Sequence, residues 1–209
     1  MRRYAIVITG AVLCAAVLTS AEAVSAGPIV LLEKTFAELG GGSPASGLIT
    51  YDYNYNDTFT GQMVSRAFDM ASGDYLYLYQ VVNDGPSSME VFGLAPFFGF
   101  QEGGSLTGGE PTGFLADGLE PAGANYDDTL DEPLVTFSYP AYLGDQVPAG
   151  EHTRVLYLVS PYASVEGEGY VIDGGVDAGP VVTTLPEPAT LGLLAGGAVL
   201  MVGLRRKRR

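Results

Sequence analysis

Residues 74–85, DYLYLYQVVNDG, carry apolar or aromatic side chains at almost every position before a turn. The odd positions from 75 to 81 are three tyrosines and a valine, and Leu76, Leu78 and Val82 alternate with them. In an extended chain, successive side chains point to opposite faces. Both faces of this segment must therefore be covered, which predicts a central strand of a two-layer β structure.

Further segments also favour strands. In residues 48–55, Ile49 and three tyrosines alternate with polar residues, as in a strand with one wet face. Residues 61–70, 134–140 and 154–161 are further strand candidates. Residues 89–100 are rich in aromatics but contain two glycines and a proline, which predicts a bent or bulged strand. Residues 29–39 are the one helix candidate, and they could equally begin with a strand.

Gly-, Pro- and Asp-rich stretches at residues 40–47, 101–113 and 117–133 separate these segments and are expected to be loops. Short strands divided by turn clusters, without helices between them, favour an antiparallel arrangement over α/β. We therefore expect an all-β fold over residues 27–183: an antiparallel β-sandwich of the immunoglobulin-like or jelly-roll-like kind.

The first 26 residues have the pattern of a secretory signal peptide. Arg2 and Arg3 precede an apolar core over residues 4–18, and small residues follow. Cleavage is expected after Ala26, with Ala23 as the alternative; the other interpretation is an uncleaved N-terminal anchor. Removal of residues 1–26 also removes the single cysteine, which excludes disulfides and cysteine-based sites from the mature domain.

The expected domain is strongly acidic. Residues 27–184 contain three basic and 22 acidic residues, a formal charge of −19. The basic residues are Lys34, Arg66 and Arg154. Like charge repels, so this balance argues against nucleic acid as a partner. Cations and uncharged or cationic polymers stay open, as does acidity that serves only solubility.

Clustered carboxylates suggest one metal site. Asp127, Asp128 and Asp131 lie close together in a loop-like stretch, and oxygen ligands of this kind suit Ca²⁺. The spacing is not that of an EF-hand, and with 22 carboxylates such clusters also arise by chance. No other cofactor is indicated.

Two other groups of side chains have a functional and a structural interpretation. Tyr75, Tyr77 and Tyr79 would stack against sugar rings if their face were exposed, but tyrosine also fills half-buried sheets. The single histidine, His152, lies beside Glu151 in a turn and fits a surface residue better than a catalytic one, since no G-x-S-x-G motif occurs. A glycan-binding module and a secreted hydrolase are thus the alternative functions.

The C-terminus has three parts: Pro186-Glu187-Pro188, an apolar run over residues 189–204, and a basic tail. The tail consists of Arg205, Arg206, Lys207, Arg208 and Arg209. In this order and position, residues 184–209 closely resemble the PEP-CTERM sorting signal of Gram-negative bacteria. The resemblance implies recognition and processing by exosortase, a membrane-embedded transpeptidase-like enzyme, and delivery to the cell surface or the exopolysaccharide matrix.

Physical reasoning agrees with that implication. As a helix, the 16-residue run over 189–204 would be ~24 Å long, shorter than a ~30 Å hydrocarbon core. The basic tail would stay in the cytoplasm by the positive-inside rule. We therefore expect an exported, non-enzymatic protein that passes through an inner-membrane intermediate with a single transmembrane helix. Its partners would be exosortase and, at the surface or in a biofilm matrix, exopolysaccharide.

Overall fold

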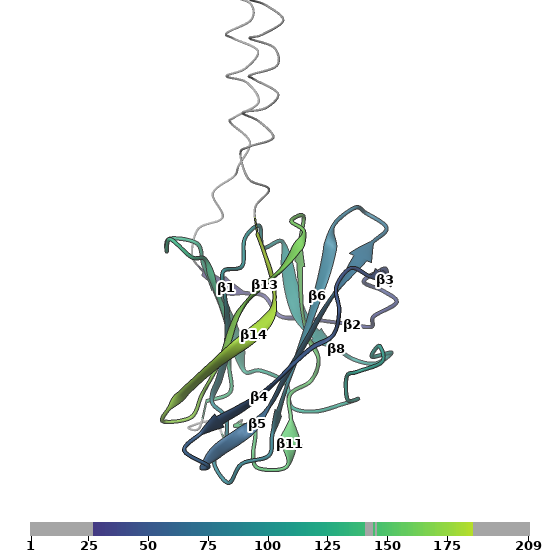
Figure 1. Cartoon of the computed structure of the whole chain (residues 1–209). Coiled ribbons are helices and arrows are strands. Elements are labelled where there is room, and N and C mark those ends of the chain that lie inside the picture. The colour runs from purple at the N-terminus through teal and green to yellow at the C-terminus, as the bar shows by residue number, and fades with distance from the viewer. Residues whose placement is uncertain (1–26, 141–143, 145, 186–209) are drawn as a thin grey trace, which may run out of the picture.

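The computed structural model describes residues 27–140, 144 and 146–185, and these contain strands and turns but no helix (Figure 1). Sheet A consists, in spatial order, of β1 (Gly27–Ile29), β9 (Gly123–Asp127), β10 (Leu134–Ser138), β7 (Val91–Ala95), β13 (Ser164–Ile172) and β14 (Val176–Thr184). Sheet B consists of β2 (Leu32–Lys34), β8 (Glu102–Leu106), β12 (Leu156–Ser160), β6 (Tyr75–Asn83), β5 (Phe59–Met70) and β3 (Gly41–Pro44), with β11 (Glu151–His152) paired to β6 and β4 (Ile49–Tyr55) paired to β5. The expected all-β fold class is confirmed.

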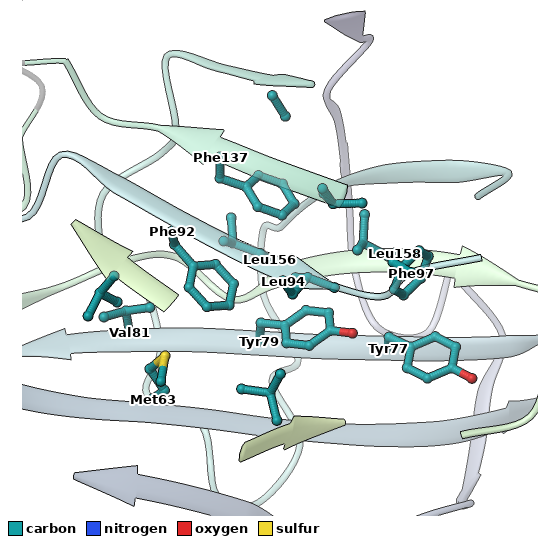
Figure 2. Packing of buried hydrophobic residues seen from close by; sticks show 14 of the residues in the cluster. Met63, Tyr77, Tyr79, Val81, Phe92, Leu94, Phe97, Phe137, Leu156 and Leu158 are labelled. Carbon is teal, nitrogen blue, oxygen red and sulfur yellow. The ribbon is translucent and has the colours of Figure 1, made fainter. Parts of the chain in front are cut away.

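The main core lies between the two sheets (Figure 2). Phe92 and Phe137 of sheet A stack with their ring centroids 6.3 Å apart, and Tyr79 of sheet B lies 5.9 Å from Phe92. Leu156 and Leu158 of β12 complete this layer from sheet B. Each strand alternates its side chains between this core and the outer face, so the two-layer arrangement follows from the period of two in the sequence.

A second hydrophobic cluster covers the outer face of sheet B. Leu76 and Leu78 of β6 pack there with Tyr157 of β12, under Phe36 and Leu39 from the turn that follows β2. This cluster explains why β6 is apolar on both faces. The prediction that residues 74–85 form a central strand is confirmed, because β6 lies between β12 and β5.

Several expected loops contain strands. Residues 40–47, 101–113 and 117–133 include β3, β8 and β9, and residues 29–39 form the end of β1, β2 and a turn instead of a helix. β2 pairs parallel to β8, and a Cβ at Gly104 would lie 1.8 Å from the carbonyl oxygen of Leu32. The glycines that indicated a loop are thus the residues that permit a close strand approach.

The two ends of the described fold point toward the same end of the sheets. Every neighbouring pair in sheet A is antiparallel. Because five such pairings separate β1 from β14, the start of β1 and the end of β14 point toward the same end, the upper one in Figure 1. The register places Gly27 in line with Gly179, so Thr184 lies five residues further toward that end. Gly27 and Thr184 are thus roughly 24 Å apart across the sheet and roughly 17 Å apart along it.

Candidate functional site

The prediction that Tyr75, Tyr77 and Tyr79 form an exposed sugar-binding face is wrong for two of these three residues. Tyr77 and Tyr79 are fully buried between the sheets (Figure 2). Tyr75 is half-buried at the start of β6. The hydroxyl of Tyr77 donates a hydrogen bond to the Tyr162 carbonyl at 2.6 Å. Burial is the main cause that raises the pKa of Tyr77 and of Tyr79 above the usual value. This face of β6 is the inner face because the second layer packs on it.

The carboxylate cluster does not form a metal site in the described residues. Within the ranges that the structure covers, no three His, Cys, Asp or Glu side chains gather in a way that could hold a metal ion, and this includes Asp127, Asp128 and Asp131. Asp127 Oδ1 instead accepts hydrogen bonds from Thr129 Oγ1 at 2.6 Å and from its N–H at 3.0 Å. These two bonds, the side-chain one first, lower the pKa of Asp127. The carboxylate closes a local turn.

His152 is held in a structural contact. Its Nε2 lies 3.1 Å from the carbonyl oxygen of Ala116, and its strand β11 pairs with the end of β6. The neighbouring backbone joins the same region, because Leu119 N–H donates to the His152 carbonyl. The ring therefore helps to fix the segment that passes over the outer face of sheet B.

The basic residues of the described chain all make contacts near the second hydrophobic cluster. Lys34 Nζ lies 2.6 Å from Glu102 Oε1, and the Tyr157 hydroxyl donates to the same oxygen at 2.9 Å. Arg154 pairs with Glu120, and the Arg66 guanidinium lies 5.5 Å from the centroid of the Phe68 ring. No sequence pattern indicates the Lys34–Glu102–Tyr157 group, because its members lie on three strands far apart in the chain. All three basic side chains of the described residues are therefore engaged in such contacts.

The outer edge of β14 is capped by side chains from sheet B. Val182 N–H donates to Ser65 Oγ at 2.9 Å, and the Tyr79 hydroxyl donates to the Val182 carbonyl at 2.8 Å. Further along, Asp177 Oδ2 accepts from the N–H of Asn54 on β4 at 2.6 Å. An exposed strand edge invites pairing with other chains. These bonds link the two sheets at the β14 edge and satisfy the Val182 N–H and carbonyl there.

The final residue of β14, Thr184, is also held by hydrogen bonds. The Thr184 side chain is buried, and its Oγ1 accepts a hydrogen bond from Phe98 N–H and donates one to the Phe98 carbonyl. Ser160 Oγ donates to the same carbonyl at 2.8 Å. The chain is thus fixed to the core up to Thr184, and only Leu185, which is 49% exposed, stands between this point and Pro186.

The predicted terminal signals lie outside the described residues. This applies to the signal peptide over residues 1–26, to Pro186-Glu187-Pro188, to the apolar run and to the basic tail from Arg205 to Arg209. In the part of the chain that the structure describes, no helix is long and apolar enough to cross a membrane.

Comparison with known proteins yields no match for this chain among protein-family models, curated proteins or solved structures.

Proposed function

We propose that this chain is an exported, non-enzymatic protein of the cell surface or extracellular matrix of a Gram-negative bacterium, sorted and processed at its C-terminus by exosortase. The terminal patterns support this proposal: a signal peptide at one end, and Pro-Glu-Pro, an apolar run and a basic tail at the other. The resemblance of residues 184–209 to the PEP-CTERM signal supplies the enzyme and the destination.

The structural observation that carries the proposal is the attachment of β14. Thr184 is buried and bonded to Phe98, two residues before Pro186. Because Pro186 and Pro188 resist helix formation, the segment after Thr184 is expected to leave the body as an extended strand-like stretch. A processing enzyme in the membrane would then meet Pro-Glu-Pro directly beneath a folded domain.

The positions of the first and last described strands support a fixed orientation of the unprocessed protein at the inner membrane. The start of β1 and the end of β14 point toward the same end of sheet A. Before cleavage of either terminal signal, both segments that enter the membrane leave from that end. The domain would therefore stand with this end toward the membrane and with its hairpin tips, such as β4–β5, away from it.

The finer fold class belongs to the same proposal. Among the described strands, the chain crosses between the sheets six times: from β1 to β2, β6 to β7, β7 to β8, β8 to β9, β10 to β11 and β12 to β13. Repeated crossing of this kind supports the expected immunoglobulin-like or jelly-roll-like sandwich.

Intact-mass measurement of the protein recovered from the cell surface or medium tests this function. We expect a chain that begins at Gly27 and lacks Arg205 to Arg209. The matched control is Glu187→Ala, which leaves every described residue unchanged and should keep the full C-terminus in the inner-membrane fraction. Recovery of surface-localised protein with its complete basic tail would contradict the proposal.

A further inference from the structure

The outer face of sheet A carries no covering layer in the described residues. The outer face of sheet B is covered by the second hydrophobic cluster, whereas no such cluster forms on the outer side of sheet A. Side chains there include half-buried Val91 and Ile172, neighbours in the β7–β13 ladder, and Val176, which is 54% exposed. This face is therefore an open surface with apolar and polar positions.

One aromatic ring lies against this face. Val171 points into the core, so the preceding residue, Tyr170, points outward from β13. A Cβ at Gly93, its partner on β7, would lie 2.2 Å from Tyr170 Cζ and 2.6 Å from its Cε2. The ring thus lies down across the sheet over the glycine. Only a residue without a side chain at position 93 leaves room for this arrangement.

The residues in register with Tyr170 form a continuous row across the sheet. The pairings link Pro28 to Asn125, Asn125 to Thr136, Thr136 to Gly93, and Tyr170 to both Gly93 and Ala178. At a strand spacing of ~4.8 Å, Asn125 is ~14 Å from Tyr170. The row therefore offers an aromatic platform, a hydroxyl and an exposed amide in one line, with small residues beside the ring.

The negative charge of the protein limits which polymers can bind to this face. The exposed carboxylates of Glu166 and Glu168 lie on β13 beside the platform, and the three basic residues of the described chain are engaged at sheet B. An anionic polymer would be repelled, and so would a second copy of this acidic chain. Carboxylates accept strong hydrogen bonds from hydroxyl or ammonium groups, which an uncharged or amine-bearing sugar supplies.

We infer that the outer face of sheet A binds a polysaccharide chain without anionic groups, with a sugar ring stacked on Tyr170 and its neighbours bonded to Thr136 and Asn125. This rests on the proposed function only in that an extracellular matrix supplies such polymers. The binding face is thus on sheet A and not on the inward-facing tyrosines of β6.

Affinity electrophoresis of the purified full chain in detergent, in gels containing dextran, hydroxyethyl cellulose, chitosan or alginate, tests the inference. We expect retardation by at least one of the first three polymers and none by alginate. Tyr170→Ala should weaken binding about tenfold or more, as truncation of an aromatic anchor does. Tyr170→Phe, which keeps the ring, should retain most of the affinity.

Two further variants separate binding from folding. Tyr55→Ala is the matched control: this exposed tyrosine on β4 also fills the space beside a glycine, Gly175, but off the row, and should bind like the wild type. Asn125→Ala alters an exposed side chain of the row and should weaken binding about threefold.

The inference is overturned if none of the three polymers retards the wild type, if alginate binds as well as they do, or if Tyr170→Ala and Asn125→Ala both bind like the wild type. The full chain is used unprocessed, so these results are independent of the intact-mass measurement. Failure of one experiment leaves the other proposal standing.

Discussion

The hydroxyl of Tyr79 gives the sharpest test of the seam between the two sheets. Tyr79 is fully buried on β6, and its hydroxyl donates a hydrogen bond of 2.8 Å to the Val182 carbonyl at the outer edge of β14. Tyr79→Phe keeps the ring in the core and removes only this donor. A buried acceptor left without its partner costs about 1–2 kcal/mol. We expect that loss in the free energy of unfolding at pH 7.

At alkaline pH we expect the wild type to lose stability faster than Tyr79→Phe does. Burial raises the pKa of Tyr79 well above its usual value of 10.0. Above pH 10 the unfolded chain releases this proton and the folded chain keeps it, so the wild type loses about 1.4 kcal/mol per pH unit through Tyr79 alone. The stability is fully present below pH 10 and is lost as the pH rises. Tyr79→Phe lacks this contribution, so its decline is shallower and the two curves meet at about pH 11.

Urea denaturation followed by far-UV circular dichroism at several pH values from 7 to 11 measures both effects. Tyr55→Phe is the control, because Tyr55 is 40% exposed and its ring packs beside Gly175 at the surface. We expect its stability to stay within about 0.5 kcal/mol of the wild type. Parallel curves for Tyr79→Phe and wild type above pH 10, or equal stability at pH 7, would refute the assignment of Tyr79 as a buried donor to β14.

Two more predictions follow from the strand contacts. Gly104→Ala places a Cβ 1.8 Å from the Leu32 carbonyl, a backbone atom that cannot rotate away, so β2 should be displaced from β8 with a loss of about 1–3 kcal/mol in chemical denaturation; unchanged stability would contradict the parallel pairing. Glu102→Gln should change stability by less than about 1 kcal/mol, because Lys34 and Glu102 are each about a third exposed. The pKa of Tyr157 is raised first by burial and then by Glu102, so the same variant should lower it, as read from tyrosinate absorbance, and a rise in that pKa would refute the contact.

Part of this fold could be predicted from the alternation of side chains along each strand. β6 and β12 alternate two apolar faces, which required a layer on each side, and the structure has both layers. The strand β4 showed one polar face and lies at the edge of sheet B, where that face meets solvent. In each case the side-chain period reported the number of buried faces.

The glycine-rich strands could not be predicted from the sequence. β8 contains Gly103 and Gly104, and β13 contains Gly167 and Gly169, where composition favours turns. Each of these glycines lies where another chain segment approaches: Leu158 at Gly103, Leu32 at Gly104, Thr183 at Gly167 and Val181 at Gly169. Gly93 of β7 likewise lies under the Tyr170 ring. A glycine in a turn and a glycine under a tyrosine look alike in sequence, because the reason for the missing side chain lies in a distant strand.

The sequence by itself determined that the body is all-β and strongly acidic, and it predicts export and sorting from the residue patterns at its two ends. Those properties follow from the period, charge and order of residues that are close together in the chain. Tertiary structure alone decided which tyrosines are accessible. Tyr77 and Tyr79 looked like a binding row but face the second sheet, and Tyr170, with no neighbouring row of tyrosines, lies on the open face. The strand period separates the two faces of a strand, but the packing of one sheet on another decides which face meets water.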